Sequence, residues 1–164
     1  MEVQFEDLDK SDLFIDCIYK GGKIPNMSSE TFHKLIRGER NMKFFVCETC
    51  GNFVGMIKES GAPMMCCGQK MKELVPGTSD GAVEKHVPVY KVEGNKVTVT
   101  VGSVEHPMVD AHYIEWIAVE TAKGAQRKTL KPEDKPCAEF ALTDDDSVVA
   151  VYAYCNLHGL WKAE

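Results

Sequence analysis

The stretch that decides the fold is Ser147-Val148-Val149-Ala150-Val151-Tyr152-Ala153-Tyr154-Cys155-Asn156-Leu157-His158-Gly159. Residues 147–154 are rich in β-branched and aromatic side chains and follow the polar turn 143–146, which is typical of a β-strand. The strand runs directly into Cys155 and His158. We therefore expect a β-domain that presents metal-ligating side chains where its strands end.

Several other short strands are expected between residues 79 and 164. Lys96–Val101 alternates, so that its three valines face one way and its polar residues the other. Tyr113–Thr121 is a second such segment, with Ile114, Trp116 and Ala118 expected on one face. Further strands are expected at 87–92, 125–130 and 138–142. Six or seven short strands with turns at this spacing predict an all-β domain, an immunoglobulin-like β-sandwich whose first strand opens at His86.

Residues 42–78 form a separate cysteine-rich segment. Cys47-x-x-Cys50 brings two thiolates together, and Cys66-Cys67 supplies two more after a predicted hairpin. A unit this short buries too little apolar surface to fold alone, so a metal would have to hold it together. Zinc and iron both accept four sulfurs, and a closed zinc site or two disulfides are alternatives.

A second ligand set is expected in the sandwich. It consists of four histidines at predicted strand ends and one cysteine, namely His86, His106, His112, His158 and Cys155. Zinc prefers four ligands, whereas iron tolerates five or six, so this set favours iron with one position open. A thiolate opposite the open position would push electron density onto the metal, which favours redox chemistry.

Two charged residues immediately precede the first of these histidines. Lys85 can place a positive charge near the open position and attract a small anion, although the net charge of the chain is −6. Glu84 can occupy the open position after turnover. The alternative is that both are ordinary solvated charges.

Composition limits the remaining choices. The chain has 164 residues with a net charge of −6, which disfavours nucleic acid as a partner. No run approaches the roughly 20 apolar residues of a membrane helix, and the acidic N-terminus lacks the features of a signal peptide, so we expect a cytoplasmic protein. Seven cysteines in that compartment indicate metal binding rather than disulfides. Residues 1–41 contain no ligand cluster and are expected to be an N-terminal extension of unknown role.

The chain from Met42 to Glu164 resembles desulfoferrodoxin, the two-iron superoxide reductase family. The resemblance includes both metal motifs in order, and four stretches carry it: 77–82 (GTSDGA), 102–108 (GSVEHPM), 114–117 (IEWI) and the ending 154–162 (YCNLHGLWK). Residues 1–41 are not part of the family pattern.

The resemblance implies a fold, two iron sites and a reaction. It implies a desulforedoxin-like domain at 42–78 with a rubredoxin-like iron centre, which zinc can also occupy, and an immunoglobulin-like catalytic domain at 79–164. The reaction is the one-electron reduction of superoxide to hydrogen peroxide, with Lys85 guiding the anion and Glu84 ligating oxidised iron. A homodimer with rubredoxin as electron donor is also implied. The first iron would be held by Cys47, Cys50, Cys66 and Cys67, and the catalytic iron by His86, His106, His112 and His158 with Cys155 axial.

Other functions remain open at this point. The chain could be a metal-binding electron-transfer protein without superoxide reductase activity, because a Cys-x-x-His loop also occurs in blue-copper proteins; however, no methionine follows His158. A zinc-stabilised binding module would leave Lys85 unexplained. A superoxide dismutase is a closer rival, and the thiolate favours reduction.

Overall fold

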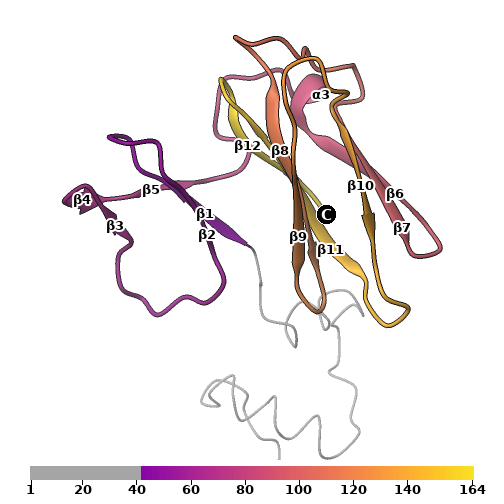
Figure 1. The fold of residues 1–164 in the computed structure, drawn as a ribbon, viewed down its shortest axis with the longest axis horizontal. Coiled ribbons are helices and arrows are strands. Elements are labelled where there is room, and N and C mark those ends of the chain that lie inside the picture. Colours follow the sequence, from indigo (N-terminus) through magenta and orange to yellow (C-terminus); the bar gives the residue numbers. More distant parts are fainter. Residues whose placement is uncertain (1–41) are drawn as a thin grey trace, which may run out of the picture. The chain divides into compact units, whose positions relative to one another are not determined.

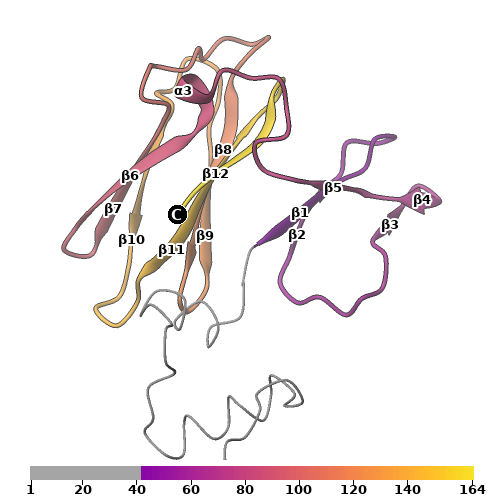
Figure 2. The same ribbon diagram turned by 180° about the vertical axis from the view of Figure 1, so that it is seen from behind.

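The structure, a computed structural model, describes residues 42–164 (Figure 1 and Figure 2). The predicted N-terminal extension 1–41 lies outside the described residues. The elements in chain order are β1 (Lys43–Val46), β2 (Phe53–Met56), β3 (Met65–Cys66), β4 (Gln69–Lys70), β5 (Lys72–Leu74), α3 (Val83–His86), β6 (Pro88–Glu93), β7 (Lys96–Val101), β8 (Ile114–Thr121), β9 (Ala125–Thr129), β10 (Cys137–Ala141), β11 (Val148–Cys155) and β12 (Gly159–Ala163).

The larger part of the described chain is a β-sandwich, as predicted. One sheet has three strands in the order β10-β7-β6, and the other has four in the order β12-β11-β8-β9. Every pairing within them is antiparallel. The order is that of an immunoglobulin-like sandwich, in which the chain crosses between the two sheets after β7, β9 and β10.

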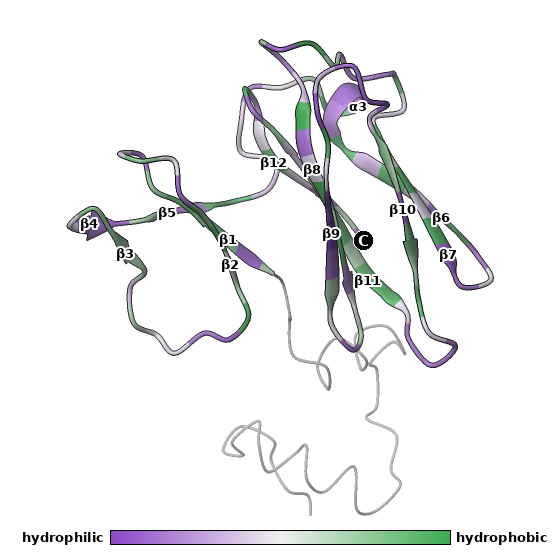
Figure 3. Ribbon diagram, viewed as in Figure 1, coloured by the Kyte–Doolittle hydropathy of each residue, from purple (hydrophilic) through white to green (hydrophobic). Residues whose placement is uncertain are grey.

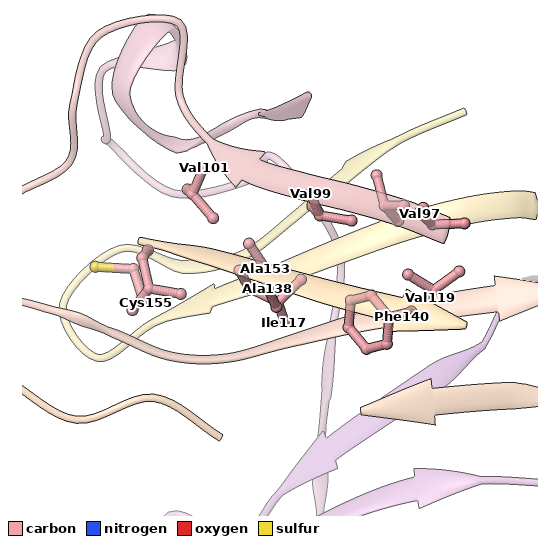
Figure 4. Close-up of a cluster of buried hydrophobic side chains, with 11 residues drawn as sticks. Val97, Val99, Val101, Ile117, Val119, Ala138, Phe140, Ala153 and Cys155 are labelled. Carbon is pink, nitrogen blue, oxygen red and sulfur yellow. The ribbon is translucent and has the colours of Figure 1, made fainter. Parts of the chain in front are cut away.

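The sandwich core lies between these two sheets. Val97, Val99 and Val101 are fully buried on one face of β7, which confirms the predicted alternation. They pack against Ile117 and Val119 of β8 and residues of β10 and β11. Figure 4 shows that Val101 and Cys155 lie at one end of this core, whereas Val97 and Phe140 lie at the other. The Cys155 thiol therefore stands where the apolar core ends.

The smaller, N-terminal part of the described chain contains a three-stranded sheet, β2-β1-β5, and the two-stranded β3-β4. Side chains of a strand alternate between faces. Phe44 accordingly packs on the outer face of the four-stranded sheet, with its ring centroid 4.9 Å from that of Trp116. Phe45, its neighbour, points the other way and packs with Cys47 and Met71. One strand thus joins this small sheet both to the sandwich and to the cysteine site. The predicted boundary at residues 78 and 79 stays a prediction.

Three local features differ from the predictions. Residues 79–164 are not all β, because His86 ends the single helical turn α3 instead of opening a strand. Ile114 does not share a face with Trp116: it packs in the sandwich core, because the pairing of β8 with β11 shifts register between Tyr154 and Cys155. The strand β12 was not predicted.

Exposure of the strands follows their position in the sheets. All residues of the edge strand β9 are exposed, and it is hydrophilic over most of its length (Figure 3). Among residues 42–164, no helix has the length and apolar character needed to cross a membrane.

Candidate metal centres

The structure brings both predicted ligand sets together. In each set the candidate ligand atoms all lie within 4.8 Å of one another. The first set, called here the histidine–cysteine site, contains His86, His106, His112, Cys155 and His158. The second, the four-cysteine site, contains Cys47, Cys50, Cys66 and Cys67.

The four imidazoles of the histidine–cysteine site are arranged as a ring of alternating planes. Neighbouring rings in the order His86, His106, His112, His158 are close to perpendicular, with interplanar angles of 78°, 77°, 71° and 75° around the circle. The opposite pair His86 and His112 is closer to parallel, at 27° and 6.0 Å between centroids. Each imidazole therefore presents an edge to the common centre.

Backbone carbonyls determine which nitrogen of two histidines faces the centre. His86 Nδ1 is 2.7 Å from the Ala82 carbonyl oxygen, and His106 Nδ1 is 2.6 Å from that of Pro107. A ring that donates its Nδ1–H to a carbonyl keeps a lone pair on Nε2. The His106 Nε2 atom is buried and has no hydrogen-bond partner, and it is the one such side-chain atom among the described residues. A buried polar atom without a partner is costly, which is what a metal ion at the centre would remove.

The donor spacing fits an ion as well. His158 Nδ1 lies 3.0 Å from His86 Nε2 and 3.1 Å from His112 Nε2. Two nitrogens bonded at about 2.1 Å and at right angles to one ion are about 3.0 Å apart. Cys155 Sγ lies 3.7 Å from the same His158 nitrogen. The residues therefore fit a metal with more than four ligands, and the mixed imidazole and thiolate set suits iron.

Burial sets the protonation of these donors. It lowers the pKa of His86, His106 and His112, that of His106 to about 4, so the three rings are neutral and able to ligate near pH 7. Burial raises the pKa of the Cys155 thiol. Because a thiolate is the form that ligates, loading this site releases a proton from Cys155.

Several supporting residues were not identified from the sequence. The Trp161 ring stacks on His86 at 4.9 Å, and its indole Nε1–H donates to the His158 carbonyl oxygen over 2.9 Å. The Ser79 hydroxyl donates to the same carbonyl. Asn156 connects two ligand loops, since its Oδ1 accepts from the Tyr113 amide at 3.0 Å. The only available signal was their presence in or near the ligand motifs.

Glu84 and Lys85 lie on α3 and are exposed, beside the buried His86. The backbone of this turn is held by the loop that leads to His106. Val104 N–H donates to the Glu84 carbonyl oxygen over 3.0 Å, and Gly102 N–H donates to that of Val87 over 3.1 Å. Burial is the largest cause that lowers the pKa of His86 and of His112. The positive charge of Lys85 is a smaller cause that lowers both pKa values further. Its positive field therefore reaches the site.

The four-cysteine site is built from two tight turns. Gly51 and Gly68 have φ values of 74° and 75°, and Cys67 has a φ of 49°, which is uncommon for a residue with a Cβ. The Sγ atoms of Cys50 and Cys66 are 3.6 Å apart, and those of Cys66 and Cys67 are 3.9 Å apart. These separations are near the roughly 3.8 Å edge of a tetrahedron with metal–sulfur bonds of about 2.3 Å. They are too long for disulfides, and no described cysteine forms one, so the disulfide alternative was wrong.

Exposure and protonation differ among these four thiols. Cys47 is buried, whereas Cys50 and Cys67 are exposed. Backbone N–H groups of Cys50 and Thr49 lower the pKa of Cys47 to about 6. Hydrogen bonds with neighbouring thiols raise the pKa of Cys66 and Cys67. In the absence of metal, the Cys47 thiolate forms readily, whereas Cys66 and Cys67 retain their protons, so loading releases protons here too.

Comparison with known proteins gives a consistent result for residues 39–164. The family described as "Desulfoferrodoxin" matches residues 78–164, and "Desulfoferrodoxin, N-terminal domain" matches residues 39–74. A "Desulfoferrodoxin homolog" of Archaeoglobus fulgidus is 49% identical over 122 residues, which is 74% of this chain and 96% of the relative. The "Desulfoferrodoxin" of Nitratidesulfovibrio vulgaris is 48% identical over 122 residues, covering 74% of this chain and 95% of the relative.

A solved structure agrees with these matches. The crystal structure of the superoxide reductase from Treponema pallidum has a TM-score of 0.66 and 42% identity, and the match covers 76% of this chain and 100% of that one. The likeness thus includes the small cysteine-containing part as well as the sandwich.

Proposed function

The chain belongs to the desulfoferrodoxin family and is a superoxide reductase, and from this premise we propose which residues perform the reaction. Superoxide, one electron and two protons give hydrogen peroxide at the histidine–cysteine site. The observation that carries the proposal is the set of four imidazoles and one thiolate within 4.8 Å, with a buried His106 nitrogen facing the centre without a partner.

The five residues of the histidine–cysteine site would hold an iron ion, and the four-cysteine site would hold a second iron or zinc. Iron in the histidine–cysteine site would supply the electron that superoxide takes up and a coordination position for the substrate. Groups other than the metal also orient the donors. Ala82 and Pro107 orient two imidazoles through their carbonyls, and Trp161 and Ser79 hold the His158 backbone.

Superoxide is an anion, and Lys85 is the residue that attracts it. The ammonium group lies on an exposed turn next to the buried His86, and its field already acts on two of the rings. We assign Lys85 to capture of superoxide and to stabilisation of the negative charge during reduction. Glu84, its neighbour, would occupy the open position once the product has left.

The protons come from water. Within residues 42–164 every histidine is one of the four proposed ligands, so none remains to relay a proton. His112 and His158 are only partly buried, so solvent reaches the site on their side, whereas the buried Cys155 closes the inner side at the end of the core.

The electron donor, assembly and compartment are proposed from the family. We propose a rubredoxin-like protein as donor, a homodimer as the assembly and the cytoplasm as the compartment. The exposed thiols Cys50 and Cys67 support the first of these, because they make one metal site accessible to another protein.

The deciding experiment counts product. Pre-reduced protein is mixed with a pulse of superoxide, and peroxide formed is measured against superoxide consumed and iron oxidised. We expect one peroxide per superoxide, with equal oxidation of the iron in the histidine–cysteine site. One peroxide per two superoxide ions, with turnover in the absence of a donor, would identify a dismutase. No reaction would leave an electron-transfer protein.

A further inference from the structure

We propose that Phe53 and Tyr154 form an electron path from the four-cysteine site to the histidine–cysteine site within one chain. This inference rests on the proposed function, because it requires a redox-active iron in each site. It also assigns a task to the four-cysteine site, which the reduction of superoxide itself does not need.

The path begins at Asn52, which contacts the four-cysteine site twice. Its side-chain Nδ2 donates to Cys66 Sγ over 3.6 Å, and its carbonyl oxygen accepts from the Cys47 amide at 2.9 Å. Phe53 is the next residue and opens β2. The thiolate cluster is therefore linked through one residue to an aromatic ring.

The middle of the path crosses from the small sheet to the sandwich. The Phe53 ring centroid lies 4.9 Å from that of Tyr154 in β11, in an edge-to-face contact of 67°. Trp116 lies beside both rings, 5.3 Å from Phe53 and stacked on Tyr154 at 5.6 Å and 9°. The three aromatic rings are therefore in mutual contact across the boundary between the small sheet and the sandwich.

The path ends at a proposed ligand. Tyr154 is covalently bonded to Cys155, whose Sγ belongs to the histidine–cysteine site. Electron tunnelling declines more steeply across empty space than along covalent bonds and between rings in contact. From Cys66 Sγ to Cys155 Sγ, the hydrogen bond of Asn52 and the contact of Phe53 with Tyr154 are the only steps that are not covalent.

The electron balance is simple. The iron of the four-cysteine site loses one electron and that of the histidine–cysteine site gains one, after superoxide has oxidised the latter. Phe53 and Tyr154 act as a bridge and are not themselves oxidised, so no proton moves and no bond changes. A one-electron donor protein then reduces the iron of the four-cysteine site through its exposed side at Cys50 and Cys67. Electrons and superoxide would thus enter at different places.

The test follows the electron directly. The full chain, with iron confirmed in both sites by absorption, is reduced and mixed with less superoxide than protein. The absorption of the oxidised four-cysteine site is then recorded as it appears while that of the oxidised histidine–cysteine site declines. Phe53→Leu and Tyr154→Leu each remove one aromatic ring of the path, whereas Tyr154→Phe keeps an aromatic ring at position 154. Phe140→Leu is the matched control, because that ring is buried in the sandwich core away from the path. Equilibrium redox titration of each variant checks that the potentials of the two sites are unchanged.

We expect a first-order transfer whose rate is independent of protein concentration. It should fall by an order of magnitude or more in both leucine variants and stay close to the unsubstituted rate in Tyr154→Phe and Phe140→Leu. Equal rates in all variants, a rate that rises with protein concentration, or a four-cysteine site whose iron keeps its electron would overturn the path. Failure of superoxide to oxidise the iron of the histidine–cysteine site would instead refute the proposed function. The electron path would then be tested with a chemical one-electron oxidant in place of superoxide.

Discussion

Replacing Gly102 by alanine should release the turn that carries Glu84 and Lys85. Gly102 has a φ of 82°, and a Cβ there would meet the carbonyl oxygens of Lys85 at 2.7 Å and Glu84 at 2.9 Å, in addition to that of Val104. All three are backbone atoms, which cannot move aside by a change of rotamer. The substitution therefore has to displace the turn that leads into His86.

The magnitude follows from the same contacts. A residue with a Cβ at this positive φ costs about 1–2 kcal/mol. The displaced turn also loses the hydrogen bonds of Gly102 with Val87 and of Val104 with Glu84, each worth about 1 kcal/mol. We expect Gly102→Ala to lower the free energy of unfolding by about 3–4 kcal/mol in all.

Gly94→Ala is the matched control. Gly94 also has a positive φ, 58°, but a Cβ there meets nothing within 4 Å, so only the conformational cost of about 1–2 kcal/mol applies. Urea unfolding followed by circular dichroism gives both values, and absorption of the loaded histidine–cysteine site reports the displacement of His86. If Gly102→Ala were no more destabilising than Gly94→Ala and its absorption unchanged, the close approach would not hold the turn.

Four further outcomes are expected. Lys85→Ala should slow superoxide capture and flatten its dependence on ionic strength in pulse kinetics; Lys58→Ala, with the same change in charge on an exposed residue, should not. Cys50→Ser should abolish the absorption of the four-cysteine site and leave first-turnover peroxide formation intact; loss of both would show instead that the two sites depend on each other. Cys155→Ser should remove the thiolate-to-metal absorption of the histidine–cysteine site alone, and unchanged absorption would exclude Cys155 as a ligand. Metal-free protein should lose stability as pH falls below about 6.5, because burial lowers the folded-state pKa of His106 to about 4 and the unfolded state then binds the extra proton. The loss from His106 approaches about 3 kcal/mol by pH 4, and urea midpoints that do not change between pH 7 and 4 would contradict it.

The sequence was informative where function depends on residue type and spacing. The Cys-x-x-Cys and Cys-x-x-His motifs indicated where the two candidate ligand sets lie, because metal ligands must be particular residues at short separations, and the structure brings the members of each set together. The alternation at Val97, Val99 and Val101 predicted a core strand for the same kind of reason, since a strand repeats every two residues.

The sequence was less informative where distant segments meet. Gly102 is needed because the backbone of residues 84 and 85 passes beside it, and no local pattern reports that approach. The shift of Ile114 into the core depends on its pairing with β11, a strand more than thirty residues away. The helical turn before His86 likewise escaped prediction, because four residues carry too little periodicity to identify a helix.

The unequal size of the two cores bears on how the protein is assembled in the cell. The valine-rich core between the two sheets contains eleven buried residues, of which only Cys155 is a proposed ligand, so we expect it to form without an ion. The small sheet has only Phe45, Cys47 and Met71 buried around its thiols, and one of these is itself a proposed ligand. We therefore expect maturation in two stages: the catalytic pocket is shaped first and accepts its iron afterwards from solvent, whereas the cysteine-rich part acquires its metal as it folds. Cells starved of iron would then accumulate a chain that is folded at one end and immature at the other.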